Sequence, residues 1–189
     1  MIRAFIAINL DAGVVEKIAG RQIALKEAGA DVRWVPPEGF HLTLKFLGDV
    51  AESQPPLILG ALQEALDGQP PLRVTARGLG AFPTVKRPKV LWVGLEGPGL
   101  IEMRDRIEQA VMPLDFPPED RDFVPHLTVG RVKSLRRWDA VLALVRESSS
   151  ECFGESRVDE VILYRSDLLR AGAVYSPLGK VPLVGATAG

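Results

Sequence analysis

The sequence predicts a fold of mixed strands and helices made of two similar halves, and two observations support this. Short apolar segments typical of strands alternate with amphipathic segments typical of helices along the chain. The same pattern also occurs twice, as His-Leu-Thr-Leu at residues 41–44 and as His-Leu-Thr-Val at residues 126–129. Each copy follows a predicted strand and helix. The distance along the chain from Phe5 to His41 is almost the same as the distance from Leu91 to His126. The chain therefore has the organisation of a duplicated unit.

The first half is expected to run strand, helix, strand, helix, strand. Its predicted strands are residues 1–10, 40–47 and 72–79. Asp11 can cap the first helix, residues 34–37 are a turn-rich link, and Ser53 with Pro55 and Pro56 starts the second helix. The predicted buried stripes of the two helices are Val15, Ile18, Ala19 and Ile23, then Leu57, Ile58, Ala61, Leu62, Ala65 and Leu66.

The second half repeats this order. Its predicted strands are residues 89–95, 125–131, 158–164 and 174–178. One predicted helix carries Leu100, Met103, Ile107 and Ala110, and the other, capped by Ser134, carries Leu135, Trp138, Val141, Leu142 and Val145. The three tryptophans (Trp34, Trp92 and Trp138) lie within or beside apolar patterns, which favours places in the core. Residues 185–189 form a small-residue tail.

Composition narrows the class of protein. With 189 residues and 47% hydrophobic content, the chain can bury a sizeable core, and we expect one domain over residues 1–189 that acts as a monomer. Lys plus Arg (23) balances Asp plus Glu (24), which argues against binding nucleic acid or membranes through bulk charge. No segment is apolar for long enough to span a bilayer, so no membrane partner is expected. The single cysteine, Cys152, cannot form an internal disulfide, which favours a reducing, cytoplasmic location.

The spacing inside each motif has a geometric consequence. Side chains two residues apart on a strand lie on the same face, so His41 would share a face with Thr43, and His126 with Thr128. The apolar residues between them would face the core. Both histidines of the chain lie in these motifs, which favours a functional site over two ordinary strand histidines. The threonines alone would be explained by strand propensity.

Two imidazoles and two hydroxyls suit displacement at a phosphodiester. One neutral histidine can take a proton from water, a protonated one can give a proton to the leaving oxygen, and hydroxyls can donate to the phosphate oxygens. Two motifs related by an approximate two-fold axis would place acid and base on opposite sides of phosphorus. No carboxylate or cysteine accompanies either motif at ligand spacing, so neither a metal nor another cofactor is expected. No Gly-Lys-[Ser/Thr] loop for ATP phosphates occurs.

The chain resembles the 2H phosphoesterase superfamily, and within it the RNA 2′,3′-cyclic phosphodiesterases, also described as 2′-5′ RNA ligases. The resemblance rests on the stretches RAFIA at 3–7, FHLTLKFLG at 40–48, PKVLWVG at 88–94, PHLTVGR at 125–131 and YRS at 164–166. It implies a bilobal α+β fold, with antiparallel sheets lining a central cleft and helices packed outside. It also implies metal-independent opening of a 2′,3′-cyclic phosphate to a 2′-phosphomonoester, with minor 2′-5′ ligation as the reverse reaction.

The resemblance also assigns roles to residues. It implies that His41 gives the proton to the leaving oxygen and that His126 takes one from water, with Thr43 and Thr128 as phosphate donors. Arg131 would be a further phosphate ligand. Its odd offset from His126 places it on the opposite face of a regular strand, so this role requires a β-bulge or a strand end.

Several alternatives remain open at this level. The substrate is expected to be RNA with a 2′,3′-cyclic end, such as a tRNA fragment, or a small cyclic nucleotide or 2′-5′ oligoadenylate. A non-catalytic binder of RNA terminal phosphates is the alternative from another class. Catalysis by the histidine pair predicts a bell-shaped pH profile with limbs on either side of neutrality, whereas simple phosphate capture would strengthen steadily as the histidines protonate. Lys86, Arg87 and Lys89 form a basic segment that fits either an RNA contact or a solvated turn.

Overall fold

The structure is a computed structural model that describes residues 1–120, 122–169 and 172–185. Its centre is a nine-stranded sheet in which all recorded strand pairs are antiparallel, with the order β7-β4-β5-β6-β3-β1-β8-β9 and with β2 paired to β6. The strands are β1 Ile2–Ile8, β2 Val32–Trp34, β3 Leu42–Val50, β4 Leu72–Thr84, β5 Arg87–Glu96, β6 His126–Val132, β7 Cys152–Val158, β8 Glu160–Leu169 and β9 Gly172–Pro182. The helices are α1 Ala12–Glu27, α2 Pro55–Ala65, α3 Leu100–Val111 and α4 Trp138–Glu147, with 3₁₀ turns at Pro37–Gly39 and Met112–Leu114.

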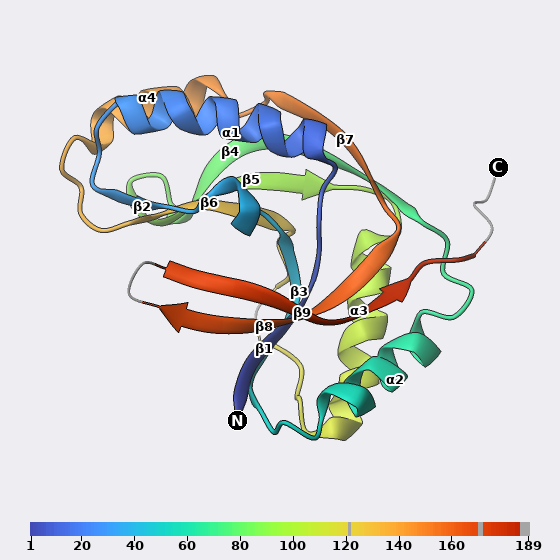
Figure 1. Cartoon of the computed structure of the whole chain (residues 1–189). Helices are drawn as coiled ribbons and strands as arrows, with labels where there is room; N and C mark the ends of the chain where they lie inside the picture. Colours follow the sequence, from blue (N-terminus) through green and yellow to red (C-terminus); the bar gives the residue numbers. More distant parts are fainter. Residues whose placement is uncertain (121, 170–171, 186–189) are drawn as a thin grey trace.

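The helices divide between the two lobes of the sheet. Helices α1 and α4 contact β7 and β4 respectively, whereas α2 and α3 pack together and contact β9 and β3 (Figure 1). Each helix buries an apolar stripe, for example Ile18 of α1, Ile58 of α2 and Ile107 of α3. The predicted α+β, bilobal, antiparallel fold is thus confirmed, with the two sheet halves joined between β6 and β3. No helix in the described ranges is long and apolar enough to cross a membrane.

Some predicted helix details are wrong. Helix α2 begins at Pro55 with Gln54 as its N-cap residue, rather than at Ser53. Helix α4 begins only at Trp138, because the preceding Arg137 is in the left-handed conformation (φ 57°). Ser134 therefore does not cap it, and its hydroxyl instead donates to the Asp31 carboxylate at 2.7 Å. Three side chains placed in buried stripes are exposed: Ile23, Leu57 and Leu135.

Two short elements differ from the sequence prediction. The predicted link at residues 34–37 overlaps strand β2 at Trp34 and the 3₁₀ turn at Pro37, and the strand itself was not predicted. A strand pairing with β4 over Cys152–Val158 was not predicted, because residues 154–157 carry no large apolar side chain and the segment shows no period-2 pattern. Strands β4, β5, β8 and β9 extend beyond their predicted limits, and most of the tail at 185–189 lies outside the described residues.

Candidate active site

The two motif strands meet at a single pair of residues. Strand β3 is antiparallel to β6 with Leu42 opposite Leu127, and both leucines are buried. Continuing this register by one residue in each direction places His41 beside Thr128 and Thr43 beside His126. Diagonal neighbours in an antiparallel pair are about 7–8 Å apart at Cα, which is the separation that this register gives for His41 and His126. The four predicted site residues are therefore brought together from both halves of the chain.

A β-bulge follows each motif threonine. In β6, Thr128 pairs with Trp92 but Gly130 pairs with Leu91, so Val129 is an extra residue. In β3, Thr43 pairs with Ala7 and residue 45 pairs with Ile6, so residue 44 is the equivalent extra residue. An extra residue reverses the alternation of faces beyond it.

The bulges bring the residue five positions after each histidine back to the histidine face. These residues are Phe46 in the first motif and Arg131 in the second, and both line the same cleft. The β-bulge that a phosphate-binding role for Arg131 requires is thus present. Phe46 is 52% exposed, which is unusual for a large apolar side chain inside a central strand.

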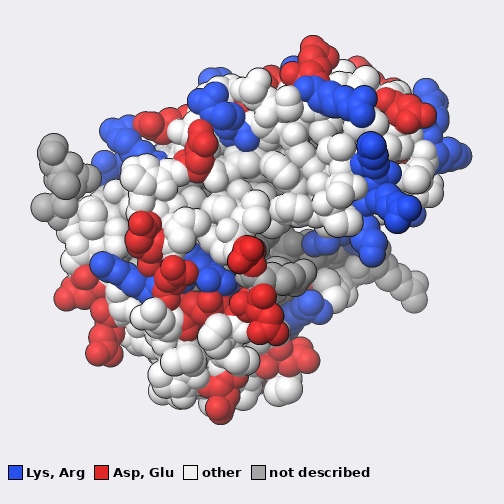
Figure 2. All heavy atoms as spheres, turned by 180° about the vertical axis from the view of Figure 1, so that it is seen from behind, with Lys and Arg blue, Asp and Glu red and all other residues white. Residues whose placement is uncertain are grey.

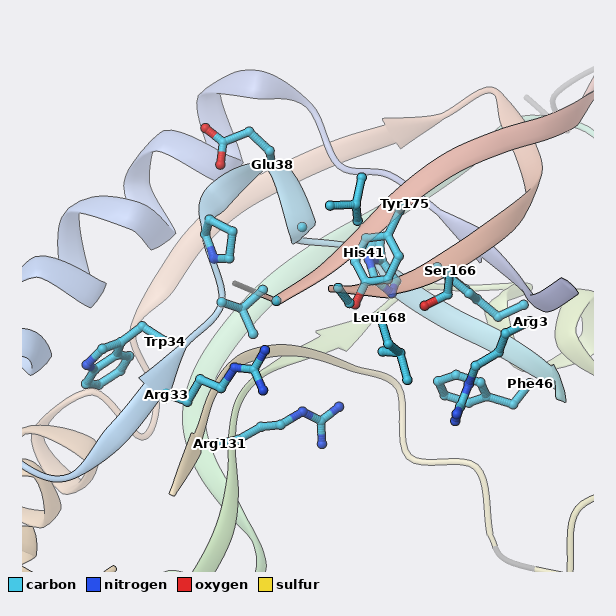
Figure 3. A pocket seen from close by; sticks show the side chains of 17 residues that line it. Arg3, Arg33, Trp34, Glu38, His41, Phe46, Arg131, Ser166, Leu168 and Tyr175 are labelled. Carbon is cyan, nitrogen blue, oxygen red and sulfur yellow. The ribbon is translucent and has the colours of Figure 1, made fainter. Parts of the chain in front are cut away.

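The cleft next to His41 has a volume of about 710 Å³, within the range of small-ligand sites (Figure 3). It lies between β2 with the following 3₁₀ turn and the strands β1, β8 and β9, and Arg131 of β6 also lines it. In Figure 3 the Arg33 and Arg131 side chains lie together, whereas Arg3 lies by Phe46 on the other side of His41. The cleft lining includes neither Thr43, Thr128 nor His126, which lie beside it on β3 and β6.

Aromatic rings surround His41. Its imidazole stacks on Phe5 with ring centroids 4.9 Å apart, and the ring of Tyr175 meets it edge-on at 5.0 Å. Burial lowers the pKa of His41 to about 4, against the opposing effect of a hydrogen bond to the backbone of Gly39. His41 is therefore neutral at pH 7 in the free protein.

His126 is held by the chain just before it. Its Nδ1 lies 2.7 Å from the carbonyl oxygen of Val124, and because a carbonyl only accepts, Nδ1 carries the proton and Nε2 keeps the lone pair in the neutral ring. Phe82 packs against the ring edge-to-face at 4.9 Å. Burial lowers the pKa of His126, the hydrogen bond to Val124 opposes this, and the charge of Arg131 lowers it further. The site thus presents a neutral imidazole with a free acceptor nitrogen.

Three arginines at the cleft have no ion pair within the described residues: Arg3, Arg33 and Arg131. Arg33 of β2 lies directly opposite Arg131 of β6. Like charges in this position destabilise a sheet unless an anion binds between them. Arg33 and Arg131 are therefore candidates for holding an anion, and of these two residues the sequence predicted only Arg131.

A buried ionic cluster lies behind the motif strand. Lys45 of β3 is 2% exposed, and its Nζ donates to Glu108 of α3 at 2.8 Å and to the Pro117 carbonyl. Glu108 also pairs with Arg104 at 2.7 Å and accepts the backbone N–H of Glu119. Burial would raise the pKa of Glu108, but these hydrogen bonds and charges together hold it below its ordinary value.

This cluster fastens the segment that leads to His126. Its contacts reach Pro117 and Glu119, and the Arg104 guanidinium lies over the Phe123 ring, 5.2 Å from its centroid. Val124, whose carbonyl orients His126, follows directly. The cluster was not found from the sequence, where the only signal was one lysine inside an apolar strand.

The tryptophans have different environments. Trp138 is 4% exposed and belongs to the core, as predicted. Trp34 is partly exposed and lines the cleft, and Trp92 is opposite Thr128, with its ring 6.5 Å from that of His126. Within the described ranges, no three His, Cys, Asp or Glu side chains are grouped so that they could hold a metal ion.

Comparisons with known proteins agree with this geometry. The family described as "LigT like Phosphoesterase" matches the chain twice, over residues 8–92 and 93–175, each match containing one motif. A Methanothermobacter thermautotrophicus protein named RNA 2′,3′-cyclic phosphodiesterase is 39% identical over 178 residues, which cover 94% of this chain and 96% of that protein. An Aquifex aeolicus protein of the same name is 35% identical, covering 93% and 94%.

Solved structures show the same fold. The crystal structure of TT0787 of Thermus thermophilus has a TM-score of 0.82 and 28% identity, covering 97% of this chain and 99% of that one. The crystal structure of E. coli LigT complexed with 3′-AMP has a TM-score of 0.73 and 25% identity, covering 96% and 98%. The duplicated motif, the antiparallel fold and these matches lead to one conclusion: the chain belongs to the LigT-like phosphoesterase family.

Proposed function

We propose that this protein hydrolyses 2′,3′-cyclic phosphate ends of RNA to 2′-phosphomonoesters, without a metal ion. The observation that supports the proposal is the pairing of Leu42 with Leu127, because each leucine lies between the histidine and the threonine of its motif. The names of the relatives support RNA 2′,3′-cyclic phosphate as the substrate.

The proposed mechanism divides the chemistry between the two motifs. His126 takes a proton from water through its free Nε2 as the water oxygen bonds to phosphorus. The bond from phosphorus to the 3′ oxygen breaks, and His41 gives that oxygen its proton. Thr43 and Thr128 donate to the non-bridging oxygens. The exchange leaves the phosphate on the 2′ oxygen, with the proton of His41 on the 3′ oxygen and the proton of water on His126.

The phosphate also supports the required protonation states. In the free protein both histidine pKa values lie below their ordinary value. A bound phosphodiester anion favours the protonated imidazole and therefore raises the pKa values of both histidines. His41 is then protonated in the complex with substrate. Arg131, with Arg33 opposite, holds the anion and keeps His126 less basic than it would otherwise be.

The same chemistry includes a minor reverse reaction. If the 5′ hydroxyl of a second RNA takes the place of water, a 2′-5′ linkage forms, but water at its much higher concentration wins. The active unit in this proposal is a monomer of one domain, residues 1–189, with two pseudo-symmetric lobes. A cytoplasmic location is in keeping with the exposed free thiol of Cys152.

Product analysis tests the proposal. A short RNA with a 2′,3′-cyclic end is incubated with the protein in excess EDTA, and the terminal phosphate is located. We expect a 2′-phosphate. A 3′-phosphate would reverse the roles of the two histidines. RNA that stays cyclic although it binds would support the non-catalytic reading, and cleavage restricted to small cyclic nucleotides or 2′-5′ oligoadenylates would replace the substrate.

A further inference from the structure

Eight basic side chains form a ridge at the end of the molecule that carries β2. They come from β2, the β4–β5 turn region, and the end of β6 with the loop after it. This basic ridge consists of Arg33, Lys86, Arg87, Lys89, Arg131, Lys133, Arg136 and Arg137. All eight are exposed, and none is in an ion pair within the described part of the chain. The carboxylates of these segments are Asp31, which is bonded to Ser134, and Asp139.

Backbone and side-chain contacts join the three segments into one surface. Strand β2 pairs with β6, and the N–H of Lys133 and the carbonyl of Arg136 both bond to the backbone of Asp31. The indole N–H of Trp138, at the start of α4, donates to the carbonyl of Val85 in the β4–β5 turn at 2.8 Å. The turn with its cations is thereby held against the segment that follows β6.

The ridge is continuous with the candidate site. Arg33 and Arg131 belong to both, because they line the cleft beside His41. Lys and Arg gather on the right of Figure 2, the side of β2 and the β4–β5 turn, whereas Asp and Glu gather below, toward α2 and α3. Since the whole chain has a net charge of only −1, this separation gives a local field rather than a bulk one.

We propose that the basic ridge binds backbone phosphates of the RNA strand on the 5′ side of the terminal nucleotide. This inference rests on the proposed function, in which the cyclic phosphate at the 3′ end occupies the site, so that the remaining strand must leave the cleft on its 5′ side. Unpaired, exposed Lys and Arg are the groups that bind a polyanion. The preferred substrate is then an oligoribonucleotide rather than a cyclic mononucleotide.

Kinetics with two substrates tests this. The kcat/KM is measured for a nucleoside 2′,3′-cyclic phosphate and for an RNA of about ten nucleotides with the same cyclic end, at several salt concentrations. We expect the RNA to be preferred at low salt, with an advantage that shrinks as salt rises. The double variant Lys86→Glu/Arg87→Glu should lose about tenfold more kcat/KM on the RNA than on the mononucleotide.

A control has the same charge change at a distance. Lys17→Glu/Arg73→Glu changes exposed cations in α1 and on β4, away from the ridge, and should leave the preference for RNA within about twofold of the wild type. Equal kcat/KM on the two substrates, or an equal loss on both in Lys86→Glu/Arg87→Glu, would overturn the proposal.

A binding measurement separates this inference from the proposed function. Anisotropy with a labelled RNA that ends in a 2′-phosphate needs no chemistry, and losing two phosphate contacts with a single strand should reduce the slope of log Kd against log salt by about 1.4. If binding weakens in Lys86→Glu/Arg87→Glu but no cyclic phosphate is opened, RNA binding by the ridge is supported and the proposed function is contradicted. If cyclic ends are opened but binding and substrate preference are unchanged in Lys86→Glu/Arg87→Glu, RNA binding by the ridge is contradicted and the proposed function is supported.

Discussion

Leu44 of β3 and Val129 of β6 hold the same position in two equivalent β-bulges, each directly after a motif threonine. Both are buried, so the bulges are anchored in the core. Beyond them the strands present different side chains to one cleft, an aromatic ring at Phe46 and a cation at Arg131. The two halves repeat the same backbone device but supply different chemistry for a ligand.

Burial lowers the pKa of His126, and the nearby charge of Arg131 lowers it further. Because a nearby cation disfavours protonation, Arg131→Gln should raise the pKa of His126. The chain has two histidines, so proton NMR titration resolves both imidazoles, and one histidine variant assigns them. His41 should titrate at about 4. Arg33→Gln is the matched control and should move His126 less, and an unchanged His126 titration in Arg131→Gln would contradict the placement of this charge.

The motif threonines should matter for rate but not for folding. Thr43→Val and Thr128→Val keep the shape of the side chain and remove the hydroxyl donor. Each should lower kcat by about 10²-fold, as loss of one transition-state donor does. Thr75→Val on β4 is the control, because Thr75 lies on the same sheet, opposite Glu96 and away from the motifs. Threonine variants with the kcat of the wild type would show that these hydroxyls do not contact the phosphate.

The buried ionic cluster of Lys45, Glu108 and Arg104 should contribute more to the free energy of unfolding than an exposed ion pair does. Glu108→Gln leaves Lys45 buried without a carboxylate and leaves Arg104 with only its neighbour Asp105, which should lower the free energy of unfolding by about 3 kcal/mol in urea denaturation. Glu155→Gln, which removes an exposed partner of Arg73, should cost less than about 1 kcal/mol. Equal losses in the two variants would contradict the role of the cluster.

The same comparison has a predicted pH dependence. The pKa of Glu108 in the folded protein lies below its ordinary value of 4.5. Its stabilising contribution is therefore complete above about 4.5 and is lost as the pH falls through the lower, folded-state value. The difference in stability between the wild type and Glu108→Gln should shrink in this acidic range.

The sequence predicted much of the fold because its strands and helices have regular periods. Period-2 alternation correctly buried Leu42 and Leu44, and helical spacing correctly buried Ile58 and Leu62. The exposed Ile23 and Leu57 lie at the edges of helix stripes, where spacing alone does not decide burial. Strand β2 has three residues, too few for a period to be recognised.

The rest of the site depends on contacts between distant segments. No local pattern places Tyr175 of β9 against His41, or Arg33 of β2 opposite Arg131. The bulge at residue 44 also puts Lys45 on the buried side, which simple alternation from His41 cannot reveal. The structure also revises the expected pH profile of the reaction. Because both histidine pKa values are lowered in the free protein, the two limbs of the profile should not lie on either side of neutrality.

The pH dependence of kcat/KM, measured in excess EDTA on RNA with a 2′,3′-cyclic end, tests the histidine pair most directly. For the wild type, kcat/KM should give a bell-shaped profile with both limbs below about pH 6.5, because kcat/KM reports the histidine pKa values of the free protein. The profile of kcat, which reports the pKa values in the complex with substrate, should be a bell at higher pH. His126→Ala should lose the acidic limb and His41→Ala the alkaline limb, each with a rate about 10²–10⁴-fold lower. Either variant keeping the rate and the profile of the wild type would contradict acid–base catalysis by the two histidines.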